Sequence, residues 1–181
     1  MKFLLSLIVL ALGVETVRAD QPTFYFGAGV SYDNVSHFIL QANPENTRTY
    51  PDISATSGKA TIGFRPLNWF ALEADYFGTA STTGNFGDRS EVQAVAGYAV
   101  FLTGAKNFDV FFKAGVNSYT LTAAGPLAGG EKDTGAGAAA GLGMQWRFGL
   151  LGLRFEYEWL PSLGKTNGLQ AVSLDLMLNV P

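Results

Sequence analysis

A strict alternation of apolar and polar side chains constrains this chain more than any other feature. Residues 153–159 read Leu-Arg-Phe-Glu-Tyr-Glu-Trp, with large apolar side chains at odd positions and charged ones at even positions. A β-strand sends successive side chains to opposite faces, so this strand has one apolar and one charged face. Such a strand can face lipid on one side and a polar lumen on the other.

Seven further segments alternate in a similar way, so we expect eight strands. They cover residues 23–32, 57–65, 69–78, 91–102, 108–120, 137–148, 153–159 and 169–179. Long connections at 33–56, 79–90, 121–136 and 160–168 alternate with short ones at 66–68, 103–107 and 149–150. This pattern predicts an all-β fold, an eight-stranded antiparallel transmembrane up-and-down β-barrel with short periplasmic turns and long extracellular loops.

Aromatic residues lie near both ends of the expected strands, where interfacial anchors of a membrane barrel belong. One expected belt, near the short turns, contains Trp69, Phe70, Phe101, Phe108, Trp146 and Phe148. The other, near the long loops, contains Tyr32, Tyr76, Phe77, Tyr119, Tyr157 and Trp159. In the strand at 91–102 we expect the face with Val92, Ala94 and Ala96 to be the apolar outer one, opposite Glu91 and Gln93.

The polar faces carry charges of both signs. We expect the lumen to contain Arg65, Lys113, Arg147 and Arg154 together with Glu73, Asp75, Glu156, Glu158 and Asp175. An eight-stranded barrel is only wide enough to be filled by side chains, and buried charges must pair. The sequence therefore predicts a plugged lumen held by an ion-pair network, and not an open pore.

The N-terminus has the pattern of an export signal. Lys2 precedes an apolar run that is too short to span a bilayer as a helix, and Val17-Arg18-Ala19 offers small residues at a signal-peptidase spacing. We expect a signal peptide at residues 1–19, cleaved before Asp20, and a single barrel domain at 20–181. The alternative, a buried N-terminal helix, would need helical partners that the rest of the sequence does not offer.

Composition excludes several classes of protein. The formal net charge is −3, whereas nucleic-acid binding requires a basic face. The chain contains no cysteine, which removes disulfides and thiolate metal sites. No later segment has the long uninterrupted apolar run of a transmembrane helix.

No motif predicts catalysis, a cofactor or a metal. His37 is the only histidine, and nothing near it in the sequence supplies a triad partner, an oxyanion site or a second zinc ligand. Glu156 and Glu158 form a carboxylate pair that the strand alternation already explains. The glycine-rich segment at 125–130 lacks the Lys-Ser/Thr of a phosphate loop, so we interpret it as a loop tip.

Two stretches resemble a known family. Residues 24–30 (FYFGAGV) and 58–78 (GKATIGFRPLNWFALEADYFG) are similar to the strands of small OmpA-like outer-membrane β-barrels, a group within the porin-like superfamily. The resemblance implies a barrel without a peptidoglycan-binding domain, in the outer membrane of a Gram-negative bacterium, with outer-membrane lipids and the barrel-assembly machinery as partners.

Fold alone does not choose a function for such a barrel. We expect a structural or surface-interaction role, with a surface ligand bound through loops 33–56 and 121–136. A small-solute porin and a soluble periplasmic lipocalin-like binding barrel are the alternatives, because alternation alone does not show which face is wet.

Overall fold

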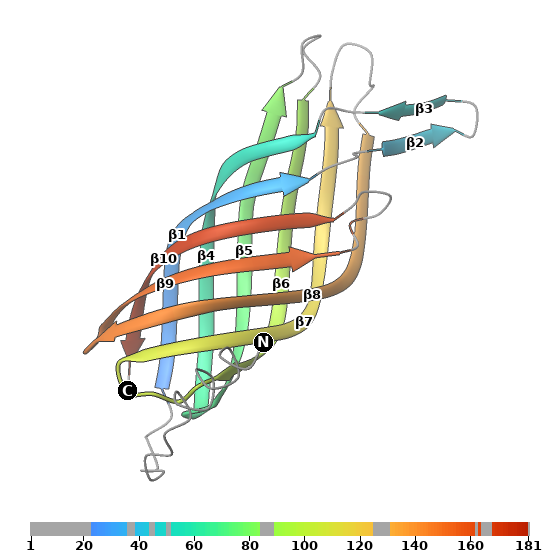
Figure 1. The fold of residues 1–181 in the computed structure, drawn as a ribbon. Coiled ribbons are helices and arrows are strands. Elements are labelled where there is room, and N and C mark those ends of the chain that lie inside the picture. Colours follow the sequence, from blue (N-terminus) through green and yellow to red (C-terminus); the bar gives the residue numbers. More distant parts are fainter. Residues whose placement is uncertain are drawn as a thin grey trace, which may run out of the picture.

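The computed structural model describes residues 23–35, 39–43, 46–49, 52–83, 89–124, 131–161, 163 and 168–180. Eight strands close an antiparallel barrel in the order β1-β10-β9-β8-β7-β6-β5-β4, which confirms the predicted fold class (Figure 1). The barrel strands are β1 (Thr23–Val35), β4 (Ile53–Leu67), β5 (Phe70–Thr83), β6 (Arg89–Leu102), β7 (Phe108–Ala124), β8 (Glu131–Phe148), β9 (Leu151–Leu160) and β10 (Leu169–Val180). Two short strands, β2 (Ile39–Asn43) and β3 (Asn46–Thr49), form a separate hairpin.

The short connections gather at one end of the barrel, where β10 also ends (Figure 1). Asn68 and Trp69 join β4 to β5, and Gly149 and Leu150 join β8 to β9. Gly149 has a φ of 70°, a left-handed conformation that a two-residue hairpin turn requires and that glycine adopts without strain. This is the periplasmic end of the predicted topology.

Several strands run further toward the opposite, extracellular end than the sequence predicted. β8 begins at Glu131 instead of 137, and β7 continues to Ala124 instead of 120, so much of the expected loop 121–136 is strand. The expected loop 33–56 contains the β2–β3 hairpin and the first residues of β4. The added residues are mostly small or hydroxylated, so they lack the strong apolar contrast on which the prediction depended.

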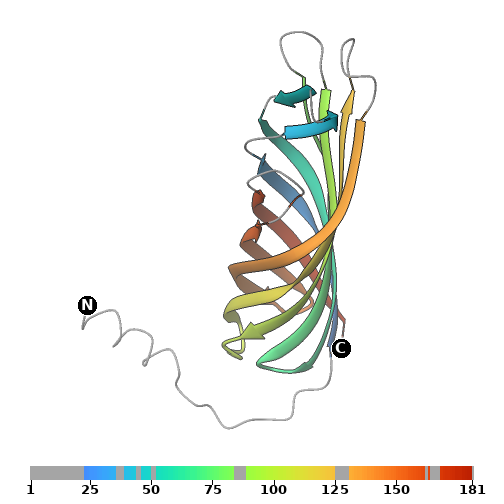
Figure 2. The ribbon, with the colours of Figure 1, turned by 90° about the vertical axis from the view of Figure 1, so that its right-hand side faces the viewer.

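The extracellular rim is uneven. The β8–β9 ladder ends at Ala140–Trp159, and the β4–β5 ladder ends at Lys59–Phe77. Beyond these two pairs, β5, β6, β7 and β8 continue as a four-stranded sheet that rises above the rest of the barrel (Figures 1 and 2). We call this projecting sheet the extracellular wall.

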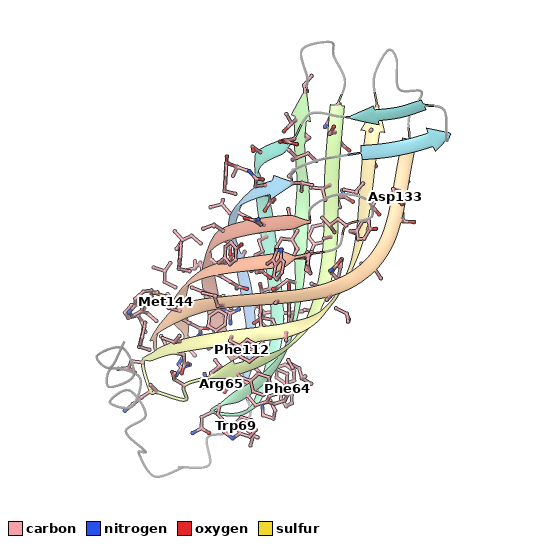
Figure 3. The ribbon with its side chains drawn as sticks, turned by 45° about the vertical axis from the view of Figure 1, so that its right-hand side comes forward. Phe64, Arg65, Trp69, Phe112, Asp133 and Met144 are labelled. Atoms are coloured by element: carbon pink, nitrogen blue, oxygen red, sulfur yellow. The ribbon has the colours of Figure 1, made fainter. Side chains whose placement is uncertain are left out.

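The outer face of the barrel is apolar. Leu174 on β10, Phe155 on β9 and Phe112 on β7 are among its exposed side chains, each 44–53% exposed in the isolated chain. Figure 3 places Phe64, Trp69 and Phe112 toward the end with the short turns, and Asp133 near the top of β8. Within the described segments no helix is long and apolar enough to cross a membrane.

The aromatic belt near the short turns has its predicted orientation, but the extracellular belt contains fewer outward-facing rings than predicted. Tyr32, Tyr76 and Trp159 point outward, whereas Phe77 and Tyr119 are buried inside the barrel. Phe77 pairs in register with Lys59, an inward residue of β4, and the alternation of the strand therefore turns its ring inward.

The predicted orientation of β6 was wrong. Val92, Ala94 and Ala96 are buried in the lumen, while Gln93 and Val95 face outward. The register explains the inversion, since Ala96 lies between Asp75 and Asn117, both of which point inward. The inner face of β6 is apolar because it fills the barrel, so polarity alone could not identify which of its faces is wet.

Candidate functional site

A network of buried charges fills the middle of the lumen. Three cations face five carboxylates there. The eight side chains come from five strands, and each is at most 1% exposed. This central network consists of Lys59 on β4, Glu73 and Asp75 on β5, Lys113 on β7, Arg154, Glu156 and Glu158 on β9, and Asp175 on β10. Because a buried charge is costly unless it is paired, the pair geometry decides whether the lumen is stable.

Lys113 lies at the centre of the network. Its Nζ is 3.1 Å from Oε1 of Glu73 and 2.7 Å from Oε1 of Glu158, and it also pairs with Asp75 and Glu156. The same ammonium group lies 4.1 Å from the ring centroid of Tyr98. One side chain of β7 thus connects β5 with β9 across the lumen.

The other two cations complete the links between opposite walls. Lys59 Nζ lies 2.6 Å from Oε2 of Glu158 and 3.0 Å from Oε2 of Glu156. Arg154 Nη1 lies 2.6 Å from Oε2 of Glu73, and its Nε and Nη2 donate to Oε1 of Gln145. Each cation therefore contacts carboxylates on a strand other than its own.

Inward glycines leave room for these long side chains. A Cβ on Gly141 would lie only 2.8 Å from Cε of Lys113, and one on Gly63 would overlap the ring of Tyr25. The hydroxyl of Tyr25 donates to Oε2 of Glu73 at 2.7 Å. Gly141 and Gly63 therefore leave the space that the side chains of Lys113 and Tyr25 occupy.

The structure brings seven of the nine predicted lumen residues into one network and separates Arg65 and Arg147 from it. The predicted set does not include Lys59, although Lys59 has the same strand parity as Arg65 and belongs to the central network. It also left out Asp109, which has the same strand parity as Lys113 and is buried. Parity applied to every charged residue could have found both.

Arg65, Arg147 and Asp109 form a second cluster near the short turns. Arg65 Nη1 lies 3.2 Å from Oδ2 of Asp109, and Arg147 pairs with the same oxygen. Both arginines also donate to turn carbonyls, Arg65 to Asn68 and Arg147 to Lys106. The cluster holds the turns together at the periplasmic end of the lumen.

An apolar layer closes the extracellular end of the lumen. Ile53, Val35, Leu169 and Leu160 occupy successive paired positions on β4, β1, β10 and β9, and each is at most 1% exposed. On the far side Val92 is paired with Leu121, and both are buried. Side chains therefore fill the described lumen at three levels: turn cluster, central network and apolar layer.

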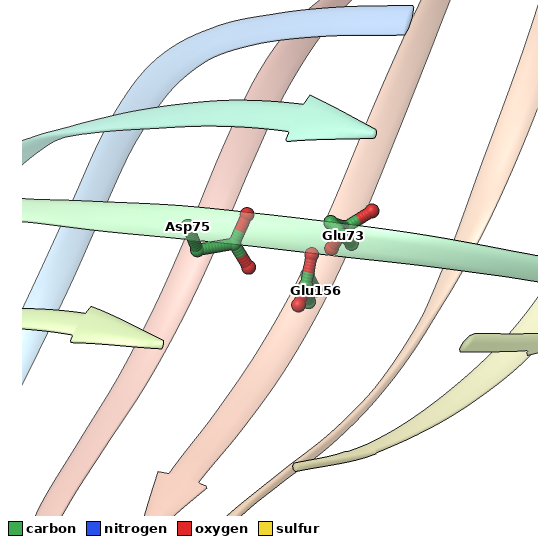
Figure 4. A group of neighbouring side chains, drawn as sticks. All are labelled: Glu73, Asp75 and Glu156. Carbon is green, nitrogen blue, oxygen red and sulfur yellow. The ribbon is translucent and has the colours of Figure 1, made fainter. Parts of the chain in front are cut away.

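Three carboxylates of the central network come close enough to suggest a metal site. Oxygen atoms of Glu73, Asp75 and Glu156 lie within 4.8 Å of one another (Figure 4). Each of the three is already ion-paired with Lys113, whose positive charge would repel a metal ion at that position. The geometry therefore favours an internal ion-pair network over a metal centre.

Two of the segments considered for chemistry, His37 and the glycine-rich segment at 125–130, lie outside the described residues. The Glu156–Glu158 pair belongs to the central network, where both side chains are buried and bonded to lysines. The described parts of the predicted ligand loops are residues 33–35, the β2–β3 hairpin, residues 52–56, and the extracellular ends of β7 and β8 at 121–124 and 131–136. Among these parts, β2 contacts β8.

Comparisons with known proteins agree with this geometry. Residues 19–177 match the family model of the OmpA-like transmembrane domain. No curated protein sequence matches the chain significantly.

Several solved outer-membrane barrels have a similar fold. The attachment invasion locus protein Ail of Yersinia pestis, in complex with the heparin analogue sucrose octasulfate, superposes with a TM-score of 0.62 at 10% identity, covering 88% of this chain and 99% of Ail. The N-terminal β-barrel domain of OprF from Pseudomonas aeruginosa gives 0.60 at 12% identity, covering 90% and 99%. Neisserial surface protein A gives 0.60 at 12% identity, covering 92% and 99%. At these identities the likeness concerns the fold alone.

Proposed function

Because this chain belongs to the OmpA-like transmembrane domain family, a group of outer-membrane β-barrels, we propose that it is a closed barrel whose extracellular end binds surface ligands. The barrel anchors the extracellular wall and the β2–β3 hairpin in the membrane. The filling of the lumen at three levels is the observation that supports this role best, because a filled lumen leaves solute passage no continuous route.

The extracellular wall supports the binding part of the proposal. It carries polar side chains outward, among them Arg89 and Glu91, whose Nη2 and Oε1 lie 2.6 Å apart. Lys132 is exposed on β8 beside the partly exposed Asp133. The Ail structure contains a heparin analogue, but the balanced charges of this wall favour a protein ligand over a sulfated polysaccharide.

We propose a non-enzymatic role, because the described carboxylates of the central network face lysine and arginine side chains inside a filled lumen. In this proposal residues 1–19 direct export and residues 20–181 form the barrel, which the barrel-assembly machinery inserts among outer-membrane lipids. An enzyme acting on lipid A would be the competing class, and His37→Ala with lipid A mass profiles tests it. A wild-type change in the profile that disappears in the variant would contradict a non-enzymatic role.

Planar-bilayer recording of the purified protein tests the closed lumen directly. We expect no stepwise conductance, because the central network and the apolar layer occupy the lumen. Stable conductance of the wild-type protein would refute the closed barrel and favour the porin alternative.

Binding is tested by measuring how many cells that display the protein adhere to a surface coated with host extracellular-matrix proteins. Deletion of residues 43–52, within the first extracellular segment, should abolish binding while the barrel still folds. Equal binding by the deletion variant and the wild type would refute a ligand site at the extracellular end near β2 and β3.

A further inference from the structure

The central network contains more carboxylates than cations. Its five carboxylates face Lys59, Lys113 and Arg154, and no other described cation pairs with them. If all five were ionised, the three cations would leave a net charge of −2 inside a filled lumen. A buried charge without a counter-ion is so costly that the group usually becomes neutral instead. The network therefore needs a further source of positive charge.

One part of the network is balanced within itself. Glu73, Asp75 and Glu156 each contact at least two of the three cations. Glu73 lies 2.6 Å from Nη1 of Arg154 and 3.1 Å from Nζ of Lys113. Each of these three carboxylates also accepts at least one hydrogen bond from a network cation. We call these three carboxylates and the three cations the neutral core, because their charges cancel.

Glu158 lies beside the neutral core and shares its lysines. Its Oε2 and Oε1 lie 2.6 Å and 2.7 Å from the ammonium groups of Lys59 and Lys113. Both lysines also contact Asp75 and Glu156. Neither oxygen of Glu158 accepts a hydrogen bond of suitable angle from a described residue, whereas both oxygens of Asp75 accept one. Hydrogen bonds to an ionised carboxylate stabilise its charge, so the negative charge of Glu158 would be stabilised less than that of Asp75.

Asp175 on β10 has the weakest ion pairing in the network. Its one cationic partner among the described residues is Lys59, whose Nζ lies 3.7 Å from Oδ2. The same oxygen accepts a hydrogen bond of 2.9 Å from the hydroxyl of Ser173. Oδ1 is buried and has no hydrogen-bond partner among the described residues. A protonated carboxyl group needs no counter-ion, so a proton on Asp175 would remove one of the two excess negative charges.

The groups that face the two side chains supply no further positive charge. The titratable groups around Glu158 are Lys59, Asp75, Tyr98, Lys113 and Glu156. Those around Asp175 are Lys59, Arg154 and Glu156. On β8 the residue opposite Glu158 is Gly141, which has no side chain to titrate. The acidic residue on the described part of β1 is Asp33, which accepts hydrogen bonds from Ser31 and Ser57 and adds no cation.

We propose that the closed lumen binds two protons at neutral pH, one on Glu158 and one on Asp175, and that their release in alkaline surroundings destabilises the barrel. This inference goes beyond the surface-binding function and does not depend on it. With both acids neutral, the neutral core accounts for every remaining charge of the network. In the unfolded chain the same carboxyl groups are exposed and lose their protons near pH ~4. The folded barrel therefore binds more protons than the unfolded chain at neutral pH, so its stability falls as the pH rises.

Urea unfolding of the full-length protein in phospholipid vesicles, measured between about pH 5.5 and 7.5, tests the proton count. Each proton that only the folded state holds lowers the folding equilibrium constant about tenfold per pH unit. Glu158→Gln and Asp175→Asn mimic the protonated acids, so each should reduce the wild-type slope by about tenfold per pH unit, and the double variant by about 100-fold. Glu91→Gln is the matched control, because Glu91 is an ion-paired, partly exposed carboxylate of the extracellular wall, and it should keep the wild-type slope.

Infrared spectroscopy of the folded wild type tests the same protons without any substitution. We expect the carbonyl stretch of protonated carboxylic acids at neutral pH, a shift of this band in heavy water, and its loss when the protein is unfolded in urea. The band should weaken in each single variant and should weaken further in the double variant. Absence of the acid band in the folded wild type, or equal pH slopes for the wild type and the double variant, would overturn the proposal. An unchanged slope in one single variant would overturn the assignment of a proton to that residue.

Discussion

Replacement of Lys113 by methionine is expected to destabilise the barrel strongly. Methionine has a similar length and no charge, so Lys113→Met keeps much of the packing and removes the ammonium group. That group contacts Glu73, Asp75, Glu156 and Glu158, all buried, and stands over the ring of Tyr98. Its loss leaves the five carboxylates of the network to be balanced by Lys59 and Arg154 alone.

The expected loss in the free energy of unfolding is about 3–5 kcal/mol, the usual cost of removing one partner from a buried ion pair. Adding Glu158→Gln should recover part of the loss, because it removes one of the carboxylates left without a cation. A Lys106→Met variant is the control, since Lys106 is an exposed turn residue. Its effect should be close to zero.

Urea unfolding in phospholipid vesicles measures these differences. The three tryptophans, Trp69, Trp146 and Trp159, all point outward from the barrel, so their emission reports the loss of the lipid environment. If Lys113→Met lowers the unfolding free energy by less than about 1 kcal/mol, the central network does not hold the lumen together and the reasoning fails.

Glu158→Gln alone should be nearly neutral or stabilising in the same assay, because five carboxylates face three cations in the network. Glu73→Gln should lower the free energy of unfolding by about 3–5 kcal/mol, because Glu73 bonds Arg154, Lys113 and Tyr25. The reverse order would contradict the pairing described here. Leu174→Arg and Phe155→Arg should each cost about 2–4 kcal/mol if these exposed side chains face lipid near mid-membrane, and Gln170→Arg on the same face of β10 should cost little. Equal effects at positions 170 and 174 would argue against a lipid-facing band. The orientation of β6 can be tested by cysteine labelling, since the chain has no native cysteine. A membrane-impermeant maleimide should label Gln93→Cys on intact cells and spare Val92→Cys, because Gln93 faces outward and Val92 is buried in the lumen. Labelling of position 92 alone would mean that Val92 faces outward instead.

The fold could be predicted because strand period and apolar contrast coincide wherever strands cross the lipid. In β9 the contrast is complete, and Phe155 and Glu156 lie on the faces that the sequence indicated. Above the lipid the contrast fades, so the added lengths of β7 and β8 were not predictable from polarity. The uneven rim follows from unequal strand lengths and ladder ends, which a segment-by-segment pattern does not contain.

The membership of the central network could be predicted better than its connections. Parity placed Glu73, Lys113 and Glu156 inside the barrel, but which carboxylate meets which cation depends on the stagger between strands. That stagger brings Lys59 of β4 to Glu158 of β9 and puts Arg65 with Asp109 instead. The orientation of β6 failed for a related reason, because apolar residues can fill a lumen as well as face lipid.

The closure of the barrel by β1 and β10 has a consequence for the order of assembly. Phe24 is paired with Val180, so the seam joins strands from the two ends of the barrel sequence, and the wall cannot close before the last strand exists. An open sheet in lipid would leave a row of backbone N–H and C=O groups without partners, at a cost of several kcal/mol each. Lys59 and Lys113 precede their partners Glu156 and Glu158 in the chain, so these ion pairs also wait for β9. The seam and these ion pairs therefore depend on contacts between strands far apart in the sequence, and such contacts slow folding.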